Sequence, residues 1–172
     1  QALSAEQVEA LTTAQVAALT TLQVAALTSD QVAALAIDDL NVLSTASIKA
    51  LGSHQVAALT TDQVAALSTA QVAALDSQDV AVLSTAQIVA LTNEQMAALS
   101  SSQFAALGSD QIAAIEISDL QQLSTAVIRN LNTVQVQALS TEQVQALTGS
   151  QVIALTTAQL SKLTTDQIVA LD

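Results

Sequence analysis

Carboxylates that recur at a fixed interval are the side chains of this sequence with the clearest potential for chemistry. Aspartate stands at residues 39, 79 and 119, and each has a second acidic residue one or three positions before it. Carboxylate oxygens are the ligands that Ca²⁺ prefers in proteins. If this constant interval brings the pairs to one side of a regular structure, they predict a calcium site shared among Asp38, Asp39, Asp76, Asp79, Glu116 and Asp119.

Other kinds of catalytic or binding chemistry have few residues to draw on. The chain has no cysteine, and its single histidine, His54, lies between Ser53 and Gln55 at a position that is predicted to face solvent. A Ser-His-Asp triad would need that histidine, and no glycine-rich phosphate loop or metal-ligand spacing is present. We therefore expect no enzymatic activity, no catalytic residue and no cofactor beyond the calcium considered above.

The charge and the distribution of polar residues exclude two classes of partner. Three basic residues stand against fifteen acidic ones, which gives a net charge of −12. Nucleic-acid binding depends on Lys and Arg that neutralise phosphates, so this chain is not expected to bind nucleic acid. Polar residues interrupt every apolar run well short of the roughly 18 residues of a membrane span, so membrane insertion is not expected either.

An eight-residue repeat organises the whole chain. Residues 3–170 divide into 21 consecutive octads without insertion or deletion. A typical octad, residues 11–18, reads Leu-Thr-Thr-Ala-Gln-Val-Ala-Ala, and we number these positions 1 to 8. Position 1 is Leu in 20 octads, position 5 is Gln in 16, and position 6 is always a large apolar residue. We expect residues 1–172 to form a single repeat domain that is a fragment of a longer array.

Each octad carries the signals that start a helix. Position 2 is Ser, Thr, Asn, Asp or Gly in 19 octads, and these are the preferred N-cap residues. Gln three residues later completes a capping box, and the apolar residues at positions 1 and 6 form a hydrophobic staple. Because an N-cap residue is not helical, each helix must end after about six or seven residues. Thirteen of the acidic residues fall in the first turn, where they favour the helix dipole.

One octad cannot bury enough apolar surface to fold by itself. Its two large side chains contribute roughly 1.5–3 kcal/mol each when buried, whereas ordering eight residues costs roughly 12 kcal/mol. Octads must therefore stack on one another, as the units of a solenoid do. The predicted fold is an all-α solenoid of very short capped helices, one per octad, in which neighbouring repeats are the main partners. Phe104 and Met96 occupy position 6 and are predicted to be core residues.

A second period, of five octads or about 40 residues, is superimposed on the first and marks a higher-order repeat. Position 8 departs from alanine in five octads, at Val42, Val82, Gln122, Asn130 and Lys162, and all of these except Asn130 are spaced by 40 residues. We expect one turn of the superhelix to contain five octads, or half that number with two turns per unit, so that equivalent corners stack. In the octads that begin at residues 35 and 115, position 2 is Ala36 or Glu116. There we expect the cap to shift to position 4.

Repetition without reactive groups favours a structural spacer, scaffold or stalk segment. The alternative is a binding module that uses a groove of the superhelix for a protein or a glycan, although the Trp, Tyr and Arg anchors of interfaces are nearly absent. A calcium-stabilised adhesin segment and an ice-binding face of Thr and Ser rows are special cases of binding. Open terminal octads predict head-to-tail self-association, because the end repeats carry no polar cap.

The run from Leu59 to Ala74 resembles the Ala/Thr/Gln-rich octapeptide arrays of very large bacterial secreted proteins of adhesin-, haemolysin- or RTX-like type. The resemblance extends over all 21 octads. It implies a structural segment of a larger protein that is exported to the cell surface or the extracellular space, and it brings no catalytic or binding residues. The glycine- and aspartate-rich nonapeptide repeats of RTX proteins are absent, so the resemblance does not itself imply calcium binding.

Overall fold

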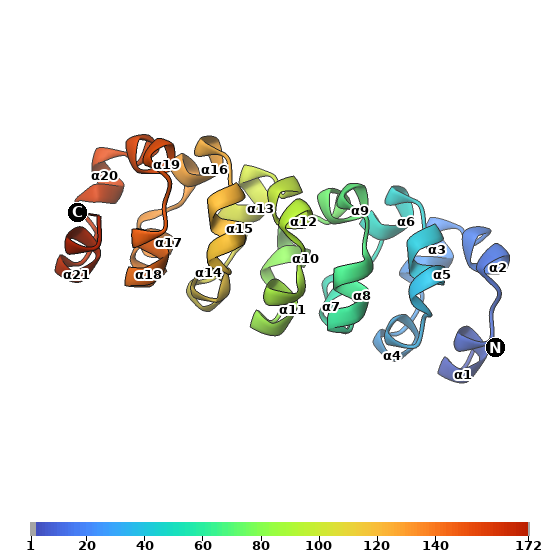
Figure 1. The fold of residues 1–172 in the computed structure, drawn as a ribbon. Helices are drawn as coiled ribbons and strands as arrows, with labels where there is room; N and C mark the ends of the chain where they lie inside the picture. The colour runs from blue at the N-terminus through green and yellow to red at the C-terminus, as the bar shows by residue number, and fades with distance from the viewer. Residues whose placement is uncertain (1–2, 172) are drawn as a thin grey trace.

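The computed structural model describes residues 3–171 as a series of short α-helices wound around one axis (Figure 1). Every helix of this range begins at position 3 of its octad and is four to six residues long. The predicted all-α solenoid with one short helix per octad is therefore confirmed, although many of the helices, at four or five residues, are shorter than the expected six or seven. The helices are α1 Ala5–Glu9, α2 Thr13–Ala17, α3 Thr21–Ala25, α4 Ser29–Ala33, α5 Ile37–Val42, α6 Thr45–Lys49, α7 Ser53–Ala57, α8 Thr61–Ala66, α9 Thr69–Ala74, α10 Ser77–Ala81, α11 Thr85–Ala90, α12 Asn93–Ala98, α13 Ser101–Ala106, α14 Ser109–Ala114, α15 Ile117–Gln122, α16 Thr125–Asn130, α17 Thr133–Ala138, α18 Thr141–Gln145, α19 Gly149–Ala154, α20 Thr157–Leu160 and α21 Thr165–Val169.

The backbone leaves the helical conformation once in each octad. The N-cap residue is extended, as at Thr60 with φ −72° and ψ 161°, and the leucine that precedes the next cap is extended too, as at Leu67 with φ −57° and ψ 140°. No residue of the described range has a positive φ. The helices therefore end without the left-handed residue that commonly closes a helix, which explains how the array manages with three glycines.

The predicted capping boxes are present in most octads. In α8 the Gln63 N–H donates to Thr60 Oγ1 at 3.1 Å, and the Thr60 N–H donates to Gln63 Oε1 at 2.9 Å.

The predicted shift of the cap to position 4 is wrong, because α5 and α15 start directly after Ala36 and Glu116 without a side-chain cap. Burial of the position 6 residue holds those two helices in register, and packing thereby outweighs the loss of one cap bond of about 1 kcal/mol.

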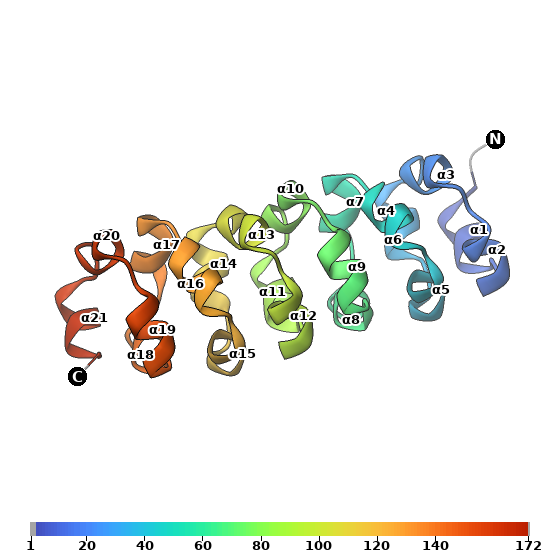
Figure 2. The same ribbon diagram turned by 90° about the horizontal axis from the view of Figure 1, so that it is seen from above.

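Three octads, not five, separate the helices that stack on one another. Each helix contacts the third helix before it and the third helix after it, so contacts run between α8 and α11 and between α9 and α12. The predicted turn of five octads, or of half that number, is therefore wrong. Figure 2 shows α10 on the opposite side of the axis from α5 and α15, although these helices are five octads apart in sequence. Two large side chains per octad can fill only a narrow core at the packing density of a protein interior. A turn of five octads would enclose a wider space than these side chains can fill.

The core runs continuously along the axis and consists of the side chains at positions 1 and 6. Phe104 and Met96 are 1% and 0% exposed, which confirms their prediction as core residues. Leucines from Leu35 to Leu163 at position 1 are buried in the same cluster. No helix within residues 3–171 is both long enough and apolar enough to cross a membrane.

Candidate functional site

The glutamine at position 5 is the polar side chain that joins successive turns. Gln95, 2% exposed, accepts the Thr92 N–H on Oε1 at 2.7 Å. Its Nε2 donates to the carbonyls of Val64 and Leu67 at 2.9 and 2.5 Å. These carbonyls lie at the end of the helix in the preceding turn, where backbone acceptors are not fully used by the helix itself. The Val64 carbonyl also accepts the Leu67 N–H at 3.2 Å. One amide therefore caps the start of its own helix and the end of another, and we call this arrangement the glutamine clasp.

The clasp repeats along the chain with a constant offset of 31 and 28 residues. Every position 5 glutamine from Gln55 onward donates Nε2 to both carbonyls, namely Gln55, Gln63, Gln71, Gln87, Gln95, Gln103, Gln111, Gln135, Gln143, Gln151, Gln159 and Gln167. Sequence reasoning assigned these glutamines to capping alone. A capping box accepts Glu as readily as Gln, but no octad has Glu at position 5. The absence of Glu at position 5 indicates that this side chain must also donate a hydrogen bond, which an ionised Glu cannot do.

Aspartate takes the place of the glutamine in α5, α10 and α15. Asp39, Asp79 and Asp119 are 4%, 2% and 1% exposed. In α10, Ser53 Oγ of the preceding turn donates to Asp79 Oδ1 at 3.0 Å, and the Asp76 N–H donates to Oδ2 at 3.3 Å. Asp119 Oδ1 is buried without a hydrogen-bond partner. These carboxylates occupy the place of the clasp but carry no donor when they are ionised.

Burial shifts the pKa of two of these aspartates. Desolvation raises the pKa of Asp79, although the hydrogen bond from Ser53 acts in the opposite direction. Desolvation also raises the pKa of Asp119, and the nearby carboxylates of Glu116 and Glu94 raise it further. Each shift follows from the cost of placing a charge where water is excluded.

The structure does not stack the acidic residues proposed as calcium ligands. Asp39, Asp79 and Asp119 belong to helices in three different rows of contacts. Their companions Asp38, Asp76 and Glu116 are exposed at the surface. Within residues 3–171, no group of three or more His, Cys, Asp or Glu side chains is placed to hold a metal ion. Calcium binding by Asp38, Asp39, Asp76, Asp79, Glu116 and Asp119 stays a prediction.

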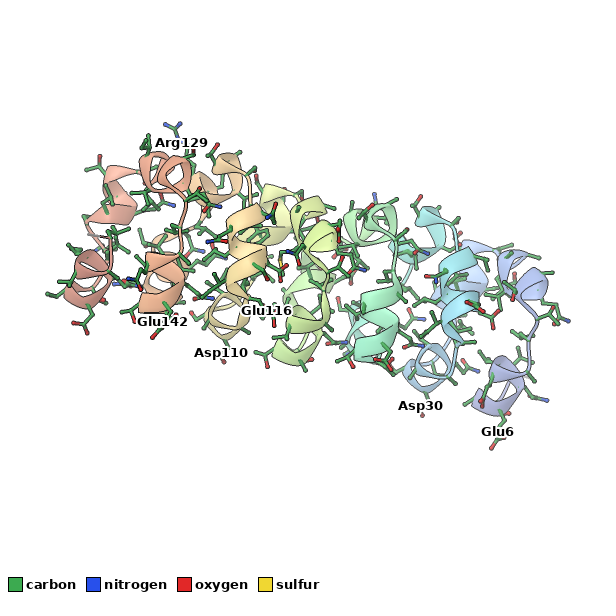
Figure 3. All side chains as sticks on the ribbon, in the orientation of Figure 1. Glu6, Asp30, Asp110, Glu116, Arg129 and Glu142 are labelled. Atoms are coloured by element: carbon green, nitrogen blue, oxygen red, sulfur yellow. The ribbon has the colours of Figure 1, made fainter. Side chains whose placement is uncertain are left out.

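The remaining charged side chains lie on the outside of the solenoid. Glu6, Asp30, Asp110 and Arg129 point away from the axis in Figure 3. Glu142 is also on the surface, and hydrogen bonds from its own backbone N–H and from neighbouring hydroxyls lower its pKa. The acidic residues Glu6, Asp30, Asp110 and Glu142 lie in the first turns of their helices and Arg129 lies in the last turn of α16. Both placements support the predicted role of the charged residues, which is to favour the helix dipole.

Neither His54 nor the surface hollow beside α11 assembles a recognisable reaction centre. His54 is exposed on α7, as predicted. The hollow, of about 380 Å³, is lined by residues that include Ser84, Thr85, Gly108 and Asp110, of which only the aspartate is charged. Its hydroxyls have no histidine beside them that would activate a nucleophile.

The fold and the clasp together define a helical solenoid of octapeptide repeats. A family model for the ALTTAQ repeat matches residues 1–21, 10–37, 33–69, 65–93 and 112–149. The chain belongs to the ALTTAQ repeat family. No curated protein matches it. The prediction that this chain is an array of octapeptide repeats is thereby confirmed.

Proposed function

We propose that this chain is a structural spacer or stalk segment of a larger, extracellular or surface-exposed bacterial protein, and that it has no catalytic activity. The observation that carries the proposal is the repetition of one clasp along the described chain. Every turn is held to the next by the same bonds and the same aliphatic contacts, so that length is set by the number of octads. The extracellular setting is supported by the resemblance of the octads to exported bacterial arrays.

The outer surface supports a spacer more than a binding module. Large apolar side chains that are exposed, such as Leu22, Val134 and Ile153, are 81%, 61% and 86% accessible and lie on α3, α17 and α19. They are spread along the solenoid and do not form the clustered aromatic and arginine anchors of protein interfaces. Thr, Ser and Ala cover most of the remaining surface. A groove that recognises a protein or glycan is therefore the less favoured function.

We further infer that this chain, studied by itself, associates head to tail. Leu3 in the first described turn is 44% exposed, and Leu160 and Ile168 in the last turns are 40% and 52% exposed. The equivalent residues of inner turns are buried against each other. The last turn of one copy thus presents the kind of surface that covers the first turn of another.

Removal of one complete turn tests the spacer function. Deletion of residues 67–90 removes three of the 21 octads, and the flanking octads can then re-form the same stacking. We expect the variant to stay helical and its maximum dimension in small-angle X-ray scattering to fall by about one-seventh, because stability and length in a solenoid are sums over repeats. The scattering is measured over a series of dilutions, because head-to-tail association weakens on dilution whereas the length of the monomer does not change.

Loss of folding on this deletion, or an unchanged maximum dimension of the monomer, would contradict a modular spacer. A matched deletion of residues 67–70, which removes half an octad, supplies the control. It breaks the octad pattern for every later residue, and we expect it to destabilise the chain strongly.

A further inference from the structure

We propose that Asp119, and to a lesser degree Asp79, are acid-dependent clasps, which link two turns when the carboxyl group is protonated and leave the link open when it is ionised. Both aspartates occupy position 5 of their octads, where other octads have the clasp glutamine, and both are buried. The constant offset of 31 and 28 residues assigns the carbonyls of Ile88 and Leu91 to Asp119. The same offset assigns those of Ile48 and Leu51 to Asp79.

A carboxyl group reproduces the hydrogen bonding of the glutamine in one protonation state only. When it is protonated, it has one O–H donor and one free acceptor oxygen, which is the pattern of the amide. When it is ionised, it has acceptors alone, and it cannot donate to the backbone carbonyls that the offset assigns to it. Asp119 Oδ1 is buried and unpartnered, as this argument requires. The proton moves between solvent and the carboxylate, and no other reactant is needed.

The surroundings of Asp119 contain no cation that would favour the ionised form. Its helix, α15, packs against α12 and α18. The charged residues on these elements are Glu94 on α12, Glu142 on α18 and the N-cap residue Glu116. The helix that carries the facing carbonyls, α11, has no titratable side chain. Burial and the carboxylates of Glu116 and Glu94 raise the pKa of Asp119.

The surroundings of Asp79 make it the weaker of the two clasps. Its helix, α10, packs against α7, which carries His54, and against α13, which has no titratable side chain. Asp76 caps α10 itself, and Lys49 lies on α6 beside the facing carbonyls. Ser53 already donates to the Asp79 carboxylate at 3.0 Å. The ionised form is therefore partly satisfied, and protonation adds less.

The direction of the pH effect follows from the raised pKa of Asp119. A group whose pKa is higher in the folded chain than in the unfolded chain binds protons more tightly in the folded state. Its contribution to stability is complete below the ordinary aspartate pKa and disappears as the pH rises through the raised value. The solenoid is thus expected to be more stable in mild acid than at neutral pH.

The isosteric variant Asp119→Asn tests this proposal, because asparagine keeps the shape and supplies a donor at every pH. At pH 7.5 we expect its melting temperature to exceed that of the unmodified chain by roughly 3–6 °C. The difference should shrink as the pH is lowered toward the ordinary pKa of aspartate, and Asp79→Asn should show a smaller gain. The matched control is Asp62→Asn, an exposed position on α8 that removes the same charge. It should give no gain.

Two results would overturn the proposal. One is an Asp119→Asn variant that is no more stable than the Asp62→Asn control at pH 7.5. The other is a rise in melting temperature of the unmodified chain, but not of Asp119→Asn, when calcium chloride is added, since the carboxylate would then be a cation ligand. Carboxyl carbon chemical shifts give an independent readout, and Asp119 must titrate above the ordinary range for aspartate.

Discussion

Replacement of Gln95 by alanine is expected to lower the free energy of unfolding by about 3 kcal/mol, because it leaves buried backbone groups on two turns without partners. The Thr92 N–H loses its acceptor and the Leu67 carbonyl loses its donor, whereas the Val64 carbonyl keeps the bond from the Leu67 N–H at 3.2 Å. Urea denaturation followed by far-UV circular dichroism measures the change. The effect exceeds that of an ordinary cap because the same side chain serves both helix ends.

Two comparisons isolate the part of this loss that belongs to the link between turns. Thr92→Ala removes only the cap of the same helix and should cost about 1 kcal/mol. Gln78→Ala removes an exposed glutamine on α10 and should cost less than about 0.5 kcal/mol. Equal losses for Gln95→Ala and Thr92→Ala would show that the Nε2 bonds to the preceding turn contribute nothing.

Truncation of Phe104 is expected to cost about 4 kcal/mol, within the range for Phe→Ala in a core. Phe104 is the largest of the fully buried side chains, at 1% exposure. It occupies position 6, where most octads have the smaller valine or isoleucine, and a cavity on the narrow axis has few neighbours that can fill it. Guanidinium titrations of the variant and the unmodified chain provide the measurement.

The matched control for Phe104 is an apolar residue that the solvent already reaches. Leu22 is 81% exposed on α3, and its replacement by alanine should change the stability by less than about 0.5 kcal/mol. A loss for Phe104→Ala no larger than this would indicate that positions 1 and 6 do not form a packed core. A comparable loss at Leu22 would mean that the chain buries a different face.

The helix start and the core positions were predictable because their signals lie inside one octad. The hydroxyl at position 2, the glutamine at position 5 and the apolar residue at position 6 interact over three or four residues, as Thr60 and Gln63 do. Local hydrogen bonds and side-chain spacing are what a single sequence shows. Each helix accordingly begins where the capping signal places it.

The number of octads per turn was not predictable because stacking leaves no trace in a uniform repeat. Contacts between α8 and α11 use the same residue types as contacts elsewhere, so a period of three octads has no sequence signature. The five-octad period appears in exposed residues such as Val42 and Val82, and also in the buried aspartates Asp39, Asp79 and Asp119. These residues change the side chain at fixed positions of the octad, but they do not determine which helices stack. The clasp leaves only an indirect trace in the sequence, the absence of Glu at position 5, because its acceptors are backbone carbonyls.

Chemical cross-linking measures the stacking most directly, because the chain has no cysteine of its own. Thr45, Thr61 and Thr85 are all exposed at position 3 of their octads. The pair Thr61→Cys with Thr85→Cys lies on the contacting helices α8 and α11, whereas Thr45→Cys with Thr85→Cys spans five octads between helices that are not in contact. With a short bismaleimide, we predict rapid intramolecular cross-linking of the first pair and little of the second. Equal rates, or a faster second pair, would contradict a solenoid of three octads per turn.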